Sequence, residues 1–121
     1  EIQALMIYSV VNEYKKIIEN KFNIAEKYEE VCKSYNIKYI NQNRQSNIGN
    51  YYKFTIISPK KNISDFLPKI KTTTSKVYDY SLGNSKEIPT KHLCLPIWFE
   101  LEEQISDKVV EEIKESFNIK K

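Results

Sequence analysis

The fold is decided by residues 2–35, whose sequence is IQALMIYSVVNEYKKIIENKFNIAEKYEEVCKSY. Apolar side chains recur there at steps of three and four, which places them on one stripe of a helix. Because Glu19-Asn20-Lys21 interrupts the apolar course and Asn23 can cap a second segment, we expect a bend or two consecutive helices near residues 12 to 23. We expect Asn36 to end the segment. The stripe consists of Ile7, Val11, Tyr14, Ile18, Phe22, Ala25, Tyr28, Cys32 and Tyr35.

The first turns of this helix are apolar on every side rather than along one stripe. A helix that is apolar all round has to be covered all round, and a chain of 121 residues can cover one face or two. We therefore expect a partner subunit, or a further part of the protein, to cover the rest. The abrupt start at Glu1 leads us to expect a fragment from the C-terminal side of a larger protein. The predicted interface residues are Ile2, Leu5, Met6, Tyr8 and Val10.

Two strands and a short helix are expected in the middle of the chain. Residues 37–40 form a short strand, and residues 51–58 form the clearest strand, with Tyr52, Phe54 and Ile56 on the covered face. Ser64 is the expected cap of the short helix that follows. From 72 to 91 no period dominates, which predicts a long irregular loop.

The last third of the chain predicts an edge strand and a closing helix. Residues 92–99 are an apolar run with Pro96 inside it, which favours an edge strand or an extended packing segment. Ser106 is the expected cap of the closing helix. Its apolar stripe is Val109, Val110, Ile113 and Phe117, and its water-facing residues are Glu111, Glu112, Lys114 and Glu115.

These elements predict an α+β fold for a single domain over residues 1–121, with long N-terminal helices packed on a small, mostly antiparallel sheet and a C-terminal helix. The composition, 40% hydrophobic and 29% charged, is that of a globular domain. No apolar run is long enough to cross a membrane and no leader is visible, so we expect a cytoplasmic protein without a membrane partner. Cys32 and Cys94 are expected to be buried thiols.

Catalytic, metal-binding and cofactor-binding residues are not predicted in this chain. His92 is the single histidine, so a multi-histidine metal site is impossible, and we expect it to be packed rather than paired with Cys94 for catalysis. The phosphate-binding glycine motifs and the nucleophile elbow are missing from the sequence. The acidic cluster is expected to be a solvated approach to the last helix; it consists of Glu100, Glu102, Glu103 and Asp107.

Lysines and aromatic residues lie together in one region, a pattern that nucleic-acid-binding surfaces also have. The net charge is only +3, and Arg44 is the single arginine, whereas nucleic-acid readers usually depend on arginine. Alternate aromatic residues on a strand more often form core. We therefore expect no nucleic-acid partner. The residues concerned are Lys53, Lys60, Lys61, Lys69, Lys71 and Lys76 with Tyr51, Tyr52 and Phe54.

Four segments resemble the C-terminal part of the DegT/DnrJ/EryC1/StrS aminotransferases. They are Glu1-Ile2-Gln3-Ala4, residues 23–28 (NIAEKY), residues 51–54 (YYKF) and residues 92–97 (HLCLPI) before the closing helix. The resemblance covers Glu1 to about Phe117. Enzymes of this family use pyridoxal phosphate and mostly aminate keto-sugars attached to a nucleotide.

The resemblance implies that this chain is the small domain and that the cofactor site lies in a large domain preceding Glu1. The first helix would then pack against that large domain and against the second subunit of a homodimer. The nucleotide-sugar and the amino-acid donor would bind to the whole enzyme, with Tyr78 and Tyr80 at the rim of the substrate pocket. Pyridoxal phosphate would not bind to this chain, which would be inactive alone. After Val77-Tyr78-Asp79, the Pro and His of many members are missing.

A second hypothesis does not need the resemblance: a stand-alone interaction protein whose apolar first helix recruits a partner. In both hypotheses the first turns of that helix bind another protein surface. The sequence leaves open the acceptor sugar, the amino donor, the origin of the fragment and the oligomeric state of the isolated chain.

Overall fold

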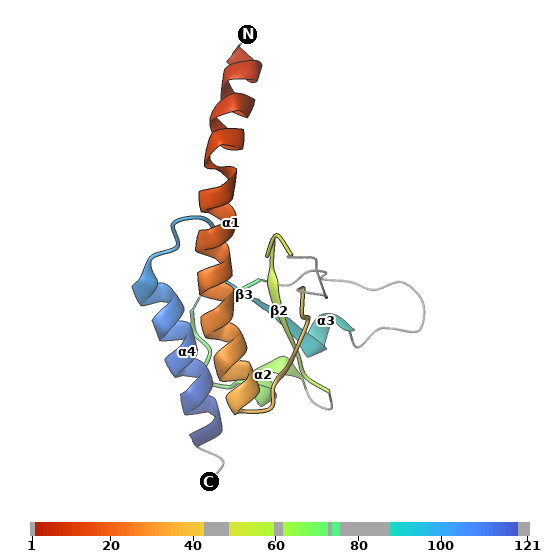
Figure 1. Ribbon diagram of the computed structural model, residues 1–121. Coiled ribbons are helices and arrows are strands. Elements are labelled where there is room, and N and C mark those ends of the chain that lie inside the picture. Colours follow the sequence, from red (N-terminus) through yellow and green to blue (C-terminus); the bar gives the residue numbers. More distant parts are fainter. Residues whose placement is uncertain (1, 43–48, 60–61, 73, 76–87, 119–121) are drawn as a thin grey trace.

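The computed structural model describes residues 2–42, 49–59, 62–72, 74–75 and 88–118. Two long helices lie side by side and cover a small sheet, and the N-terminal half of the first helix projects far beyond the rest of the chain (Figure 1). The elements in order are α1 (Ile2–Ser34), β1 (Lys38–Tyr39), β2 (Phe54–Ile57), α2 (Ile63–Phe66), α3 (Ile88–Lys91), β3 (His92–Leu95) and α4 (Glu103–Asn118).

The helix α1 is a single element of 33 residues, so the expected bend or break near residues 12 to 23 is wrong. Its sequence contains no glycine or proline that would interrupt the backbone hydrogen bonds. The helix ends where the sequence predicted, because Asn36 adopts a left-handed φ of 53°. The N–H of Ile37 then donates to the Cys32 carbonyl and that of Asn36 to the Lys33 carbonyl, a Schellman motif.

The three strands form an antiparallel sheet in the order β1-β2-β3. Of the run 92–99, predicted as an edge strand or an extended packing segment, residues His92–Leu95 form the edge strand β3, and Ser75 makes an isolated bridge to Cys94. The predicted position of Tyr52 is wrong. The strand begins only at Phe54, and Tyr51 has a left-handed φ of 47°, so the alternation of faces does not extend back to residue 52. Tyr51 is buried instead, and Tyr52 is 72% exposed.

Two predicted helix caps are wrong. Ser106 lies inside α4, which begins three residues earlier at Glu103, and its hydroxyl donates to the Glu103 carbonyl. Ser64 likewise lies inside the one-turn helix α2, which Asn62 precedes. A serine hydroxyl that bonds to the preceding turn resembles a cap in sequence, but it does not begin the helix.

The predicted faces of α4 are correct except at Glu112. Val109 and Ile113 are buried and Val110 and Phe117 pack against the core, as expected. Glu112, however, is only 7% exposed. Its carboxylate accepts hydrogen bonds from the backbone N–H groups of Lys71 and Thr72, each at 3.0 Å, so it holds the segment after α2 instead of facing water.

The core lies between the C-terminal half of α1, the sheet and α4. Tyr28 stacks edge-on against Phe54, with ring centroids 5.4 Å apart, and Val109 and Ile113 are fully buried beneath them. The expected α+β class is thereby confirmed. Of the segment 72–91, the structure describes residues 72, 74–75 and the short helix α3; Tyr78 and Tyr80 lie outside the described residues.

Candidate functional site

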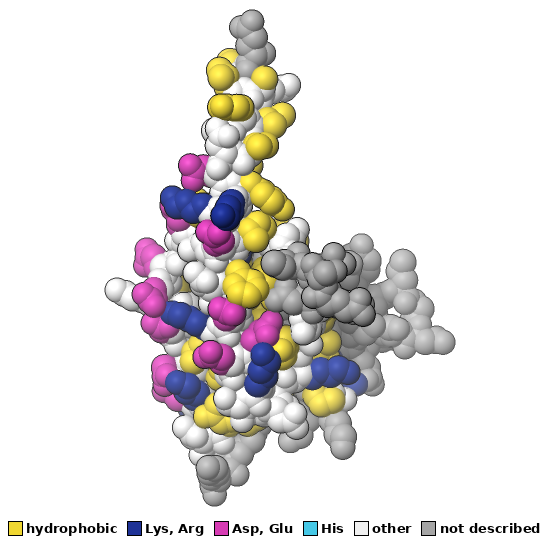
Figure 2. All heavy atoms as spheres, viewed as in Figure 1, with side chains coloured by type: hydrophobic (Ala, Val, Ile, Leu, Met, Phe, Trp, Pro, Cys, Tyr) yellow, Lys and Arg dark blue, Asp and Glu magenta, His cyan; other side chains and the backbone are white. Residues whose placement is uncertain are grey.

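The candidate functional site is the projecting segment, defined as residues Ile2–Tyr14 of α1. Its large apolar side chains are all more than half exposed; Ile2 is 76% and Leu5 is 68% exposed. Figure 2 shows these hydrophobic side chains gathered along the part of the helix that rises above the domain. Scattered apolar side chains are ordinary on a surface, but a contiguous apolar patch marks a site of protein contact. The exposed set is Ile2, Leu5, Met6, Ile7, Tyr8, Val10, Val11 and Tyr14.

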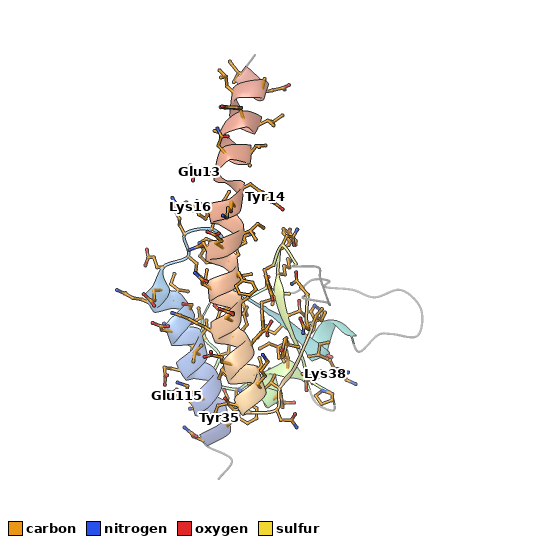
Figure 3. The ribbon with its side chains drawn as sticks, in the orientation of Figure 1. Glu13, Tyr14, Lys16, Tyr35, Lys38 and Glu115 are labelled. Carbon is orange, nitrogen blue, oxygen red and sulfur yellow. The ribbon has the colours of Figure 1, made fainter. Side chains whose placement is uncertain are left out.

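All five predicted interface residues belong to this exposed set: Ile2, Leu5, Met6, Tyr8 and Val10. Their binding to a partner stays a prediction. The sequence stripe that begins at Ile7 changes its environment along the helix. Ile7, Val11 and Tyr14 are exposed, whereas Ala25, Tyr28 and Cys32 of the same stripe are buried. Figure 3 shows Glu13, Tyr14 and Lys16 where α1 leaves the domain, and Tyr35 at its other end beside α4.

The C-terminal half of α1 anchors the projecting segment to the domain. The Tyr28 hydroxyl is buried and donates a hydrogen bond of 2.8 Å to the Pro96 carbonyl. On the α4 side, the Lys27 ammonium group lies 2.8 Å from the Glu103 carboxylate and 2.9 Å from that of Asp107. The hydrogen bonds to Glu103 and Asp107 raise the pKa of Lys27 above its ordinary value. These contacts fix the direction in which the projecting segment leaves the domain.

A second anchor is the Glu29 carboxylate, which gathers groups from three parts of the chain. The Tyr51 hydroxyl donates to one oxygen at 3.1 Å. The Tyr39 hydroxyl and the Lys33 ammonium group donate to the other oxygen, at 3.3 and 3.1 Å. Burial, and after it the charge of Glu29, raises the pKa of both Tyr51 and Tyr39. The tyrosines therefore stay neutral donors, and the cluster ties α1 to β1 and to the start of β2.

Exposed aromatic residues also lie at one end of the sheet. Tyr52 and Trp98 are 72% and 48% exposed, and two open hollows adjoin them. The larger hollow, of about 410 Å³, lies between Trp98 and the start of α4. The smaller, of about 240 Å³, lies between Trp98 and Tyr52. Sequence reasoning missed both residues as surface features, because Tyr52 and Trp98 each stood in an apolar run that predicted burial.

The other candidate groups of the sequence are placed in structural roles. His92 and both cysteines are buried. The Cys94 sulfur lies 3.4 Å from the Thr55 hydroxyl, and burial together with the charge of Glu29 raises the pKa of Cys32 to about 12. A thiol of that pKa is no nucleophile at neutral pH.

The described residues show neither a metal site nor a membrane-spanning helix. No three or more His, Cys, Asp or Glu side chains are grouped there so as to bind a metal ion. None of the helices in the described part of the chain combines the length and the apolar character that crossing a membrane requires.

The acidic cluster is exposed, as predicted, and two of its members bind Lys27. Of the three aromatic residues that suggested nucleic-acid stacking, Tyr51 and Phe54 are buried and only Tyr52 is exposed. Bases stack on aromatic side chains only where the rings are exposed.

No protein-family model and no curated protein matches this chain. Solved structures share its fold. A DegT DnrJ EryC1 StrS aminotransferase from Brucella abortus superposes with a TM-score of 0.75 at 19% identity, over 94% of this chain and 35% of that one. The aminotransferase TlmJ from Streptoalloteichus hindustanus gives a TM-score of 0.70 at 14% identity, over 89% of this chain and 34% of that one.

A third structure, the putative sugar aminotransferase Spr1654 from Streptococcus pneumoniae in its apo form, gives a TM-score of 0.70 at 8% identity, over 91% of this chain and 34% of that one. At these identities the likeness is one of fold. The fold that the resemblance implied is thereby confirmed: it is found in aminotransferases of the kind that the sequence motifs suggested. The chain spans about a third of the length of each of these enzymes.

Three described lysines do not offer the amine that pyridoxal phosphate, which such enzymes carry, would need. The cofactor needs a lysine whose amine is neutral in a desolvated site. The described lysines with a shifted pKa have it raised: Lys27 by Glu103 and Asp107, Lys33 by Glu29, and Lys114 by Glu111. Raised pKa values keep these amines protonated at neutral pH, so no chemistry of the cofactor is assigned to them.

Proposed function

We propose that this chain is the small C-terminal domain of a pyridoxal-phosphate-dependent aminotransferase that acts on a nucleotide-linked keto-sugar in the cytoplasm. A single observation carries the proposal: the fold matches aminotransferases over almost the whole of this chain but over only a third of theirs. The sequence motifs at residues 1–4, 23–28, 51–54 and 92–97 point to the same family independently of the fold.

In this proposal the large domain and the second subunit of a homodimer cover the projecting segment. The exposed side chains of Ile2, Leu5 and Tyr8 support it, because they leave an apolar helix without cover from the described part of the chain. The domain would also form one wall of the substrate cleft, with Tyr78 and Tyr80 at its rim. It would bind no cofactor and would be inactive alone.

The coding sequence upstream of Glu1 tests the assignment most simply. We expect an in-frame region that encodes a pyridoxal-phosphate-binding domain, and we expect the complete product to transfer an amino group from an amino acid to a nucleotide-linked keto-sugar. A start codon just before Glu1, with a separate promoter, would contradict the proposal and favour the stand-alone interaction protein.

Titration of the isolated chain with pyridoxal phosphate tests the absence of the cofactor site. We expect no stoichiometric absorbance change, because in this proposal the lysine and the phosphate-binding groups of the cofactor site lie in the large domain. A yellow complex that borohydride fixes onto one lysine would contradict this part of the proposal. The lysine would be identified by peptide mass spectrometry.

A further inference from the structure

The loop between β3 and α4 carries Trp98, the single tryptophan of the chain, and its side chain is 48% exposed. This loop lies beside the middle of α1 (Figure 1). The larger hollow, of about 410 Å³, lies between Trp98 and the start of α4. Sites for small ligands are hollows of a few hundred Å³. None of the residues that line this one has a role in the proposed function.

Two walls of the hollow are held by hydrogen bonds to the long helices. The Glu112 carboxylate on α4 accepts the backbone N–H groups of Lys71 and Thr72, each at 3.0 Å. The Tyr28 hydroxyl on α1 donates to the Pro96 carbonyl at 2.8 Å. Both acceptor and donor belong to rigid elements of the core, so these walls keep their places whether or not a ligand is bound.

The turn that carries Trp98 is held in the same way. The Leu101 N–H donates to the Trp98 carbonyl at 3.3 Å, and the Glu100 N–H donates to the side-chain oxygen of Asn20 at 3.0 Å. Glu100 itself has a left-handed φ of 59°. Residues other than glycine rarely adopt this conformation, and they do so preferentially at functional sites. The hollow is therefore preformed, which reduces the ordering that binding requires.

The lining combines apolar side chains with two cationic ones. Lys71 and Lys108 contribute ammonium groups, and within the described part of the chain neither of these side chains forms an ion pair. An exposed aromatic side chain binds planar rings, and an ammonium group binds carboxylates or phosphates. A ligand that uses both features has a ring and a negative group. The apolar part of the lining consists of Pro96, Trp98 and Ile105.

The charges of the lining favour a carboxylate over a phosphate. Lys71 and Lys108 bring two positive charges and Glu102 brings one negative charge, so one positive charge remains for the ligand to neutralise. This matches a monoanion. Phosphate sites commonly use arginine forks or the backbone of glycine-rich loops, and neither arginine nor glycine belongs to this lining.

We propose that this hollow binds a small aromatic monocarboxylate. The ring of the ligand lies against the Trp98 side chain, and its carboxylate lies against the ammonium groups of Lys71 and Lys108. This site is additional to the proposed function and does not depend on it. Because the hollow is open and both lysines are exposed, binding is weak, with a Kd of roughly 1 mM for a ligand of the size of phenylacetate.

The fluorescence of Trp98 tests the proposal on the 121-residue chain, because excitation at the long-wavelength edge of the indole band avoids the tyrosines. The chain is titrated with phenylacetate and with three analogues: 2-phenylethanol lacks the charge, acetate lacks the ring, and 2-phenylethylamine carries the opposite charge. We expect a saturable change of the emission with phenylacetate. Each analogue should bind about 10-fold more weakly or not at all, since it loses the ring contact or the pairing with the lysines.

Three lysine variants keep the Trp98 signal and locate the carboxylate. Lys71→Gln and Lys108→Gln should each weaken phenylacetate binding about 5-fold, the effect of one exposed charge pair. Lys53→Gln is the matched control, because Lys53 lines the smaller hollow beside Trp98 and not the larger one, and it should leave the affinity unchanged. The far-UV circular dichroism of each variant is compared with that of the wild type.

Trp98→Ala removes the fluorescent group, so saturation-transfer NMR of the phenyl protons replaces the emission for this variant. We expect the transfer to be lost. Equal binding of 2-phenylethanol and phenylacetate would overturn the proposal, because the hollow would then select only for apolar character. Unchanged affinity in both Lys71→Gln and Lys108→Gln would overturn it too, and so would tighter binding of uridine diphosphate than of phenylacetate. The upstream coding sequence decides the aminotransferase assignment separately.

Discussion

Glu112 is the buried carboxylate whose removal should cost the domain most. It accepts two backbone hydrogen bonds, from Lys71 and Thr72, each at 3.0 Å. A hydrogen bond to a charged group contributes about 1.5–3 kcal/mol, and the two share one acceptor, so we expect Glu112→Ala to lower the free energy of unfolding by about 2–4 kcal/mol. Urea unfolding followed by circular dichroism at neutral pH measures this loss.

The control is Glu111→Ala, one residue away on α4. The Glu111 side chain is exposed and pairs with Lys114 on the surface of α4, so its loss should cost less than about 1 kcal/mol. If Glu112→Ala costs no more than Glu111→Ala, the carboxylate does not hold the segment after α2.

The pH dependence of the same two variants gives a second, independent check. Burial raises the pKa of Glu112, but the N–H groups of Thr72 and Lys71 lower it by more, so it lies below the ordinary value of 4.5. A group with a lowered folded-state pKa stabilises the fold above its unfolded pKa and loses this effect as the pH falls through the folded pKa. The stability gap between wild type and Glu112→Ala should thus be full above about pH 4.5 and shrink in acid. A constant gap down to strong acid would refute the reasoning.

Two further predictions concern the core. Tyr28→Phe should lower the free energy of unfolding by about 1 kcal/mol, because the Pro96 carbonyl loses its buried donor. Tyr14→Phe on the exposed segment is the control and should leave the free energy of unfolding unchanged. Equal urea midpoints for the two variants would contradict this prediction. Both buried thiols should resist an aromatic disulfide reagent in the native chain and react completely in denaturant; they are Cys32, whose pKa is raised to about 12, and Cys94. Rapid labelling of either thiol in the native chain would contradict their burial in a closed core.

The elements that the sequence predicted well are those with a long regular pattern. The apolar period of α1, its end at Asn36 and the stripe of α4 all depend on the spacing of side chains along one element. The small, mostly antiparallel sheet was also predicted, and the three described strands are antiparallel. The family resemblance predicted the same fold from four short motifs.

Two of the missed features depend on contacts between elements far apart in sequence, and one depends on the backbone conformation of a neighbouring residue. The sequence predicts that Glu112 faces water, but the backbone N–H groups of Lys71 and Thr72 donate hydrogen bonds to its carboxylate. The sequence predicts that Tyr52 lies on the covered face of the strand, but the left-handed conformation of Tyr51 changes the alternation of side chains between the two faces. The sequence predicts an interruption of the helix at Asn20, but the side-chain oxygen of Asn20 accepts a hydrogen bond from the N–H of Glu100. Periodicity cannot show such contacts, because each partner lies in another element.

Hydrogen–deuterium exchange of the projecting segment tests most directly whether it is a protein-binding surface. The amides of residues 2–14 would be followed by mass spectrometry in the 121-residue chain at increasing concentration, with those of Ile24 to Cys32 as the internal reference. We predict that protection of residues 2–14 rises with concentration while the reference stays constant. Exchange of residues 2–14 at one rate over the whole concentration range would contradict the account.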